Sequence, residues 1–192
     1  MPGIARRAPG SGGHIFRSHA QRLDAPTPVT IRIFVTGGTF DKQYDELKGA
    51  LAFRETNVEH VLARGRNKLD VAIEVLMLVD SLEMTWEQRA KVVEACRTCA
   101  EDRVVVTHGT DTMVETARAI AAGDVGKTVV LTGAMVPYAF GSSDGLFNLG
   151  SALSFAQLLP AGVFVAMNGR CFRWDNVRKN REVGGFEALH PE

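Results

Sequence analysis

The chain has 192 residues, of which 45% are hydrophobic, and its 22 basic residues balance its 22 acidic residues at a formal net charge of zero. This length and composition predict one globular domain with a sizeable core and exclude a largely disordered chain. A net charge of zero argues against electrostatic binding to nucleic acid or to an anionic membrane, and no apolar stretch approaches the roughly 18 residues of a membrane-spanning helix.

Residues 1–28 differ in composition from the rest of the chain. They contain four of the seven prolines, no acidic residue before Asp24, and four arginines scattered among glycine, alanine and serine. They lack the apolar core of a secretory signal, whereas an organelle transit peptide would share their arginine-rich, acid-poor composition. This composition favours a disordered leader or an overlong start of the reading frame, with residues 29–192 as the folded domain.

From Val29 onward, strand-like and helix-like segments alternate along the chain. Expected strands cover 30–36, 71–78, 103–107, 127–132 and 162–167, and expected helices cover 56–65, 85–101, 112–122 and 145–158. The strands are short continuous apolar runs, which are typical of a parallel sheet covered on both faces. The sequence therefore predicts an α/β fold, a single domain with a doubly wound, mostly parallel sheet flanked by helices.

The first expected strand ends in Thr36-Gly37-Gly38-Thr39. Paired glycines allow a tight turn and a close approach of a ligand to the backbone, and the hydroxyls stand where open α/β sheets bind ligands. The loop alone is also compatible with a plain turn or with a phosphate cradle. Neither GxGxxG nor GxxxxGK[ST] is present, so the fingerprints of nucleotide binding are lacking.

The helix expected over 85–101 begins with a capping box formed by Thr85 and Gln88. Apolar residues recur within it at a spacing of three to four, which predicts a stripe that faces the core. The members of this expected stripe are Trp86, Ala90, Val93 and Cys96 or Arg97.

The same helix contains Cys96 and Cys99, a lone CxxC. Helix packing is the favoured interpretation, because a zinc site needs about four ligands. Cys171 brings the total to three cysteines, an odd number. This number favours a reducing compartment, such as the cytoplasm, over a disulfide scaffold.

The third expected strand ends in a second polar loop, His108-Gly109-Thr110-Asp111-Thr112. Asp111 is compatible with a helix cap and also with an acceptor for an ammonium group. The Thr110 hydroxyl would lie beside the backbone N–H groups of a helix start, an arrangement that can stabilise an oxyanion. His108 is interpreted as a structural hydrogen-bonding residue rather than a catalytic base. Thr112 and Glu115 are expected to form a second capping box.

A hydroxyl nucleophile needs an activating base, because its own pKa lies far above 7. No G-x-S-x-G elbow of a Ser-His-Asp hydrolase is present. The candidate activators are Lys179, just past the last expected strand, and the tyrosines Tyr44 and Tyr138. Each of them alone is equally compatible with an ordinary surface side chain.

Six segments follow one another along the chain: TGGTF (36–40), DSLEM (80–84), THGTDTMVET (107–116), VVLTGAMVP (129–137), SSDGLFNL (142–149) and VRKN (177–180). Together they resemble the bacterial-type L-asparaginases, amidohydrolases that convert asparagine to aspartate and ammonia. The resemblance runs from about Thr30 to about Phe186, and the pairing of TGGT with HGTDT is highly specific. The chain is most similar to the short-chain members, whereas full-length members carry a second, smaller C-terminal domain that would begin where this chain ends.

The resemblance implies a role for each matching residue. Thr39 would be the primary nucleophile, and Tyr44 would assist it from a mobile loop that spans 40–50. Thr110 would be the second essential threonine, with Lys179 as its basic partner. The matches that imply substrate binding are Gly38, Ser81 for the α-carboxylate and Asp111 for the α-ammonium.

The resemblance also implies two-step acyl transfer on L-asparagine, with no metal and no organic cofactor. The expected partners are the small-molecule substrate and copies of the same chain in a homo-dimer or homo-tetramer, without nucleic acid or membrane. Long relatives have a glutamine where this chain has Leu82. Two alternatives stay open, namely a related amidase such as a glutaminase and a non-catalytic amino-acid-sensing domain of the same fold.

Overall fold

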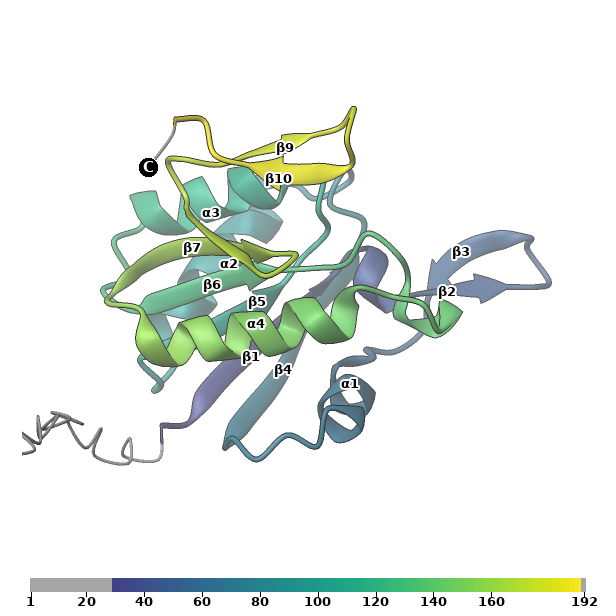
Figure 1. Cartoon of the computed structure of the whole chain (residues 1–192), viewed down its shortest axis with the longest axis horizontal. Coiled ribbons are helices and arrows are strands. Elements are labelled where there is room, and N and C mark those ends of the chain that lie inside the picture. The colour runs from purple at the N-terminus through teal and green to yellow at the C-terminus, as the bar shows by residue number, and fades with distance from the viewer. Residues whose placement is uncertain (1–28, 191–192) are drawn as a thin grey trace, which may run out of the picture.

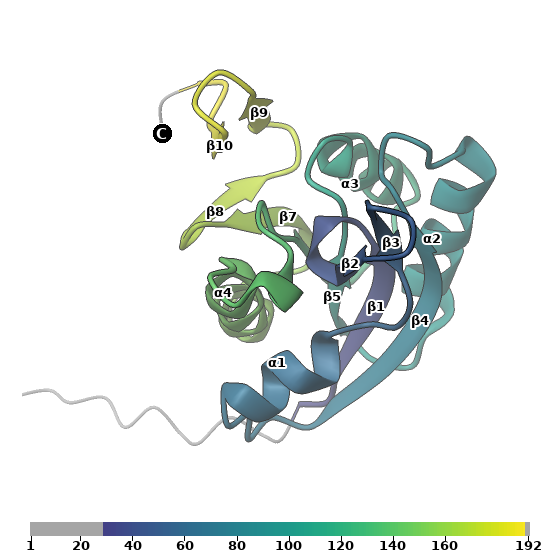
Figure 2. The ribbon, with the colours of Figure 1, turned by 90° about the vertical axis from the view of Figure 1, so that its right-hand side faces the viewer.

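The computed structural model describes residues 29–190, so the prediction for residues 1–28 lies outside the described part of the chain. A six-stranded sheet forms the centre of the molecule, and helices cover both of its faces (Figures 1 and 2). Its strands are β4 (Val71–Val79), β1 (Ile31–Gly37), β5 (Arg103–Thr107), β6 (Thr128–Thr132), β7 (Gly162–Met167) and β8 (Arg170–Arg173), in this spatial order. The helices are α1 (Val58–Arg64), α2 (Trp86–Thr98), α3 (Met113–Ala122) and α4 (Gly145–Leu158).

The first five strands of this order pair in parallel, and only β8 pairs antiparallel with its neighbour β7. The predicted doubly wound, mostly parallel sheet is therefore confirmed. The chain leaves β1 toward β4 through α1 and leaves β4 toward β5 through α2, so its direction along the sheet reverses between β1 and β5. Such a reversal opens a crevice at the carboxyl ends of the two strands, where α/β proteins bind ligands.

Successive side chains of a strand point to opposite faces of the sheet, so the molecule has two separate hydrophobic cores. Val104 and Val106 of β5 point into a core shared with α2 and α3, whereas Val105 points into a core shared with α1 and α4. Figure 2 shows these two helix pairs on opposite sides of the sheet. Burial on both faces explains why the strands read as continuous apolar runs. Among residues 29–190, no helix is long and apolar enough to cross a bilayer.

The α2 helix confirms its predicted cap but not its predicted core stripe. The Thr85 hydroxyl accepts from the Gln88 N–H, and the Gln88 side chain accepts from the Thr85 N–H, which completes the capping box. The buried residues of α2 are Arg89, Val92 and Cys96. Cys96 belongs to the expected stripe, whereas Arg89 and Val92 each precede an expected member by one residue. Trp86 is 68% exposed, because its ring lies on the surface under the Arg89 guanidinium, 5.2 Å from the ring centroid.

The second predicted capping box, at the start of α3, is wrong. The Thr112 hydroxyl does not cap the helix but donates to the backbone carbonyl of Ser81 (2.7 Å). The Glu115 carboxylate accepts from Arg89 on α2 (3.1 Å). Both side chains therefore join α3 to neighbouring segments, a tertiary preference that local spacing does not reveal.

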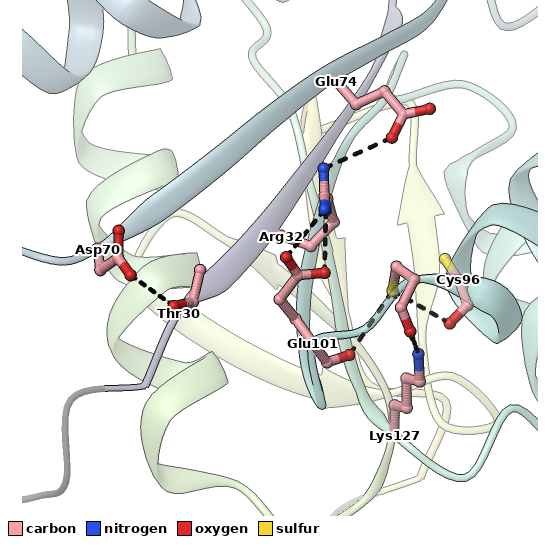
Figure 3. A network of polar contacts seen from close by, with 8 residues as sticks. Thr30, Arg32, Asp70, Glu74, Cys96, Glu101 and Lys127 are labelled. Carbon is pink, nitrogen blue, oxygen red and sulfur yellow. Dashed lines mark hydrogen bonds and ion pairs between the residues drawn. The ribbon is translucent and has the colours of Figure 1, made fainter.

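A polar network lies at the amino ends of the strands, opposite the crevice (Figure 3). The Arg32 guanidinium donates to both carboxylate oxygens of Glu101 (3.0 and 2.9 Å) and lies 3.6 Å from the Glu74 carboxylate. Lys127 donates to the backbone carbonyl and to the sulfur of Cys99. Cys96 lies fully buried in the α2–α3 core, in agreement with the helix-packing interpretation of the CxxC.

Three hairpins complete the fold, and none of them was predicted. They are β2–β3 (Lys42–Asp45 with Ala50–Phe53), β7–β8, and β9–β10 (Arg178–Asn180 with Gly185–Glu187). The β7–β8 turn is Asn168-Gly169 with positive φ at both residues, a type I′ signal that was available in the sequence. Two short 3-10 turns, η1 (Thr39–Asp41) and η2 (Tyr138–Phe140), follow β1 and β6.

The segment expected as a mobile loop, 40–50, is instead the η1 turn followed by most of the β2–β3 hairpin. The hairpin turn is fixed by the Asp45 carboxylate, which accepts from the backbone N–H groups of Leu47 and Lys48 (3.1 and 3.2 Å). Gly49, at φ 62°, completes the turn in the left-handed region. Figure 1 shows this hairpin projecting from the body of the molecule.

Candidate active site

The loops that follow β1 and β5 meet through their glycines. Gly38 has a φ of 78°, and a Cβ placed on it would lie 2.3 Å from the backbone nitrogen of Gly109. Only glycine fits such a contact, because any side chain would push the two loops apart. Thr39 and Thr110 directly follow these glycines, so the contact brings the two threonine-bearing loops to one place at the crevice.

The threonines of the two loops fall into two groups. Thr36 and Thr107 are fully buried, and the Thr36 hydroxyl donates to the Thr107 backbone carbonyl (2.8 Å), which ties β1 to β5. Thr39, by contrast, is partly exposed, and within residues 29–190 its hydroxyl has no hydrogen-bond partner. Of the two hydroxyls in TGGT, the first is thus structural and the second is available for chemistry.

Lys179 connects the β5 loop to the β9 strand. Its ammonium group donates to the Thr110 hydroxyl (2.8 Å) and to Oδ1 of Asp111 (3.0 Å). The Lys179 side chain is only 11% exposed and Thr110 is 4% exposed, so water screens these contacts weakly. Arg181 approaches the same Asp111 oxygen at 3.7 Å. A hydroxyl and a carboxylate of the β5 loop therefore lie in direct contact with an ammonium group from a distant part of the chain.

Ser81 lies beside the same loop. A Cβ on Gly109 would come 2.5 Å from the Ser81 hydroxyl oxygen, and Ser81 is 2% exposed. Its loop is held by Asp80, which pairs with Lys42 from the start of the β2–β3 hairpin and accepts from the Leu82 N–H (2.9 Å). Partial burial acts to raise the pKa of the Asp80 carboxyl, but the hydrogen bonds from Lys42 and the Leu82 N–H, with the charge of Lys42, together hold this pKa below its usual value.

His108 has the structural role that the sequence predicted. Its ring is fully buried between the Gly109 carbonyl (2.8 Å from Nδ1) and the Thr116 hydroxyl (2.8 Å from Nε2). A carbonyl can only accept, so Nδ1 carries the proton and Nε2 accepts from Thr116. Burial lowers the pKa of His108 to about 4, which keeps the ring neutral near pH 7.

Asp41 is a buried carboxylate two residues after the candidate nucleophile Thr39, and no sequence motif selects it. Its Oδ1 accepts from the Asn57 N–H (2.8 Å) and the Thr56 hydroxyl (3.0 Å), whereas its buried Oδ2 has no hydrogen-bond partner within the described residues. Burial raises the pKa of Asp41 from 3.8 to about 6, although the two hydrogen bonds act in the opposite direction. Asp41 thus ties the Thr39 loop to the start of α1.

We expect Asp41→Asn to remove a pH dependence of stability. Because the pKa of Asp41 is higher in the folded chain than in the unfolded chain, the folded protein loses free energy of unfolding as the pH rises from about 4 to about 6. A difference of about two pKa units corresponds to a loss on the order of 3 kcal/mol. Urea unfolding across this range measures it.

The neutral asparagine should abolish this loss and so be more stable than the wild type above about pH 6. His108 changes the free energy of unfolding in the opposite direction. Because the pKa of His108 is lower in the folded chain than in the unfolded chain, the protein loses stability as the pH falls from 6.5 toward about 4. This second effect is present in both proteins and cancels in their difference. An identical pH dependence in wild type and variant would show that Asp41 does not titrate in this range.

A third loop, after β6, lies against the β5 loop, since a Cβ on Gly133 would come 2.3 Å from the His108 carbonyl oxygen, and residues of the SSDGLFNL segment hold it in place. The Asp144 carboxylate accepts from the backbone N–H groups of Met135 and Val136 (3.0 and 3.1 Å). The Asn148 amide donates to the Gly133 carbonyl (2.9 Å) and to Asp144 (2.8 Å). The SSDGLFNL segment therefore fixes the loop after β6, a role that the sequence alone did not assign to it.

Tyr44 is the predicted site residue that the structure does not bring to the others. It lies on β2, the residue is 58% exposed, and within the described residues its hydroxyl has no hydrogen-bond partner. The competing tyrosine, Tyr138, stacks on the buried Phe40 ring with centroids 6.4 Å apart. Phe40 directly follows Thr39, so Tyr138 supports the loop from its apolar side.

A cavity of about 580 Å³ opens elsewhere, between the hairpin, α1 and the start of α4. Its lining includes Gln43, Glu55, His60, Arg64 and Tyr138, and none of the contacting groups Thr110, Asp111 and Lys179. Among residues 29–190, no three His, Cys, Asp or Glu side chains are grouped so that they could hold a metal ion. The convergent polar groups of the crevice, rather than this cavity, identify the candidate site.

Comparison with known proteins relates nearly all of the described chain to the asparaginases. Residues 30–189 match the family model "Asparaginase, N-terminal". The chain is 36% identical to L-asparaginase 1 of Escherichia coli over 117 residues, which are 58% of this chain and 34% of that protein. It is 32% identical to a probable periplasmic L-asparaginase of Haemophilus influenzae over 174 residues, 84% of this chain and 48% of that protein.

Solved structures show the same fold. The crystal structure of L-asparaginase I from Vibrio cholerae is 26% identical and superposes with a TM-score of 0.75 over 86% of this chain and 53% of that chain. The chain spans about half or less of the length of the curated relatives described above. The matched part contains both threonine-bearing loops and the β9 strand with Lys179.

Proposed function

Because this chain belongs to the asparaginase family, we propose that it hydrolyses the side-chain amide of L-asparagine to L-aspartate and ammonia. The observation that carries the proposal is the contact of Lys179 with Thr110 and Asp111, next to the loop that presents the Thr39 hydroxyl. A hydroxyl paired with an amine and a second free hydroxyl are the groups that acyl transfer requires.

In the proposed first step, the Thr39 oxygen attacks the side-chain carbonyl carbon of the substrate. The hydroxyl proton passes to the leaving nitrogen, the C–N bond breaks, and ammonia departs from a Thr39 ester. In the second step, water attacks this ester beside the Thr110–Lys179 pair, the ester C–O bond breaks, and one water proton returns to the Thr39 oxygen. The product leaves as the carboxylic acid and releases its other proton to solvent as it becomes the carboxylate. Each step then has a nucleophile and a proton acceptor in place.

The substrate would be held by its two charged groups. Asp111 is the proposed acceptor for the α-ammonium, and Ser81 contributes to binding the α-carboxylate. Fixing both ends orients the side-chain carbonyl toward Thr39, which lowers the entropic part of the barrier. Gly38 has a supporting role, since its close contact with Gly109 sets the distance between the two loops.

Ammonia release from purified protein tests the proposal and its alternatives together. With L-asparagine, L-glutamine and an aspartyl amide as substrates, we expect L-asparagine to be preferred over L-glutamine by about 10- to 200-fold, the usual effect of one methylene. A preference for L-glutamine would support a glutaminase instead. Tight binding of L-aspartate without ammonia release from any amide would support an amino-acid-sensing domain.

Tyr44 tests whether the projecting hairpin takes part in the reaction. If the hairpin closes over the crevice, Tyr44→Phe should lower kcat on the order of 10²-fold and change KM much less, because the phenol would act in proton transfer. Steady-state ammonia release measures both constants. Tyr138→Phe is the matched variant. Unchanged kinetics for Tyr44→Phe with a loss for Tyr138→Phe would assign the assisting role to Tyr138.

We also propose that the protein works in the cytoplasm as a homo-dimer or homo-tetramer. The odd number of cysteines supports a reducing compartment. No metal or organic cofactor enters the proposed steps, since hydroxyl, amine and carboxylate groups supply all of the chemistry. Light scattering during gel filtration measures the assembly state directly.

A further inference from the structure

Arg181 is a cation at the candidate site to which the proposed reaction gives no role. Its Nη2 lies 3.7 Å from Oδ1 of Asp111, the oxygen that also accepts from Lys179. The Arg181 side chain is 69% exposed, whereas the Lys179 side chain is nearly enclosed. Both cations therefore meet one carboxylate oxygen, and within residues 29–190 Oδ2 of Asp111 accepts no hydrogen bond.

Arg181 begins the turn that follows β9 and approaches the same carboxylate as Lys179 on that strand. Lys179 and Arg181 lie two residues apart and contact Asp111, whereas Arg178 and Asn180 contact Glu187 of the neighbouring strand β10. The β9–β10 hairpin thus presents its positive charges to two different carboxylates. Arg178, with 62% side-chain exposure and its own carboxylate partner, is a matched control on the same hairpin.

The remaining groups near Asp111 offer little to a carboxylate. Ser81 provides a single neutral hydroxyl and is 2% exposed, and Leu82, 64% exposed, has no polar side-chain atom. Lys179 is already engaged with Thr110. In an α-amino acid the ammonium and carboxylate groups sit on one carbon, so a substrate whose ammonium binds Asp111 carries its carboxylate toward Arg181, which already lies 3.7 Å from Asp111. Guanidinium groups bind carboxylates through two parallel hydrogen bonds.

We infer that Arg181 is a specificity-determining residue that binds the α-carboxylate of the substrate. In the free protein Arg181 lies near Asp111. When a zwitterionic amino acid binds, two new ion pairs replace this contact: Asp111 pairs with the ammonium of the ligand, and Arg181 pairs with the carboxylate of the ligand. The inference rests on the proposed function, because it names the group that recognises the substrate at the same site. It predicts selection for free α-amino acids over amides that lack the α-carboxylate.

Calorimetry on the full chain tests this inference without relying on turnover. The ligands are L-aspartate and β-alanine, which is L-aspartate without its α-carboxylate. Arg181→Ala should weaken L-aspartate binding about 10- to 100-fold and leave β-alanine binding unchanged, since a charged hydrogen-bond pair is lost only with the first ligand. Arg178→Ala should leave both affinities unchanged. In the matching kinetic experiment, Arg181→Ala should raise KM for L-asparagine with little change in kcat.

Three results with the variants would overturn the inference. They are unchanged L-aspartate affinity in Arg181→Ala, an equal loss for β-alanine, and an equal loss in Arg178→Ala. A wild-type protein that does not bind L-aspartate would also overturn it. A wild-type protein that binds L-aspartate through Arg181 but releases no ammonia would refute the proposed hydrolysis alone, so the two failures are distinguishable.

Discussion

Thr39→Ala is expected to reduce ammonia release from L-asparagine by roughly 10⁴-fold or more, with the protein still folded. The reason is that Thr39 carries the partly exposed hydroxyl of the TGGT loop, without a hydrogen-bond partner in the described chain, where the loop meets Gly109. Removing an attacking oxygen leaves the binding groups in place but no nucleophile. Steady-state ammonia release and thermal unfolding, measured on the same preparation, give both quantities.

Thr36→Val is the matched control, since Thr36 belongs to the same loop but is fully buried. Its hydroxyl donates to the Thr107 carbonyl, so the valine should cost about 1–3 kcal/mol of stability and retain turnover. The two variants should therefore separate, one losing activity and the other losing stability. Near-normal ammonia release by Thr39→Ala would remove this residue from the reaction.

Lys179→Met should lower kcat by about 10²- to 10⁴-fold, the range for loss of a group that transfers protons. The methionine fills a similar space but cannot contact the Thr110 hydroxyl or Asp111 as the ammonium does at 2.8 and 3.0 Å. Asp111 would keep Arg181 as a cationic partner, so the variant should remain folded. Single-turnover kinetics with L-asparagine measures the chemical steps separately from product release.

Lys179→Arg distinguishes a proton-transferring amine from a simple positive charge. A guanidinium keeps the charge but does not give up its proton in proteins, and its planar shape does not reproduce the compact ammonium. We therefore expect Lys179→Arg to be nearly as inactive as Lys179→Met. Substantial activity in the arginine variant would show that Lys179 acts through its charge alone.

The sequence predicted the sheet well because burial on both faces leaves a strong local signal. All five expected parallel strands and all four expected helices are present, with ends shifted by three residues or fewer. The hairpins were missed because the strands that the prediction lacked have only three or four residues and, in β2 and β9, polar side chains. Their pairing depends on contacts across the turn, such as the Asp45 carboxylate with the backbone of Leu47 and Lys48.

The core stripe of α2 was misplaced for a related reason. Spacing predicted that Trp86 would face the core, but Arg89 takes the buried position and donates to the Met84 carbonyl and to Glu115. A buried arginine is exceptional, and it is tolerated here because these acceptors partner its charge. Hydrophobic periodicity alone cannot anticipate such a partner 26 residues away in the chain.

The residues of the candidate site also fall into those that the sequence selected and those that it did not. Thr39, Thr110, Asp111 and Lys179 were selected from short motifs, since loops at the ends of parallel strands converge on one edge. Asp41, Arg181 and Asp144 were not, because their importance lies in burial or in partners distant along the chain. Tyr44 was selected by resemblance, and its place on an exposed hairpin follows from β2–β3 pairing that the sequence did not reveal.

The most direct test of the central claim is the partition of the proposed Thr39 ester between water and an added nucleophile. L-asparagine and the β-anilide of L-aspartate share the acyl group but differ in the group that leaves. In the presence of hydroxylamine, an ester on Thr39 predicts one ratio of hydroxamate to L-aspartate for both substrates, and no product of either kind from Thr39→Ala. A ratio that depends on the leaving group, or L-aspartate formed without any hydroxamate, would contradict the acyl-transfer mechanism.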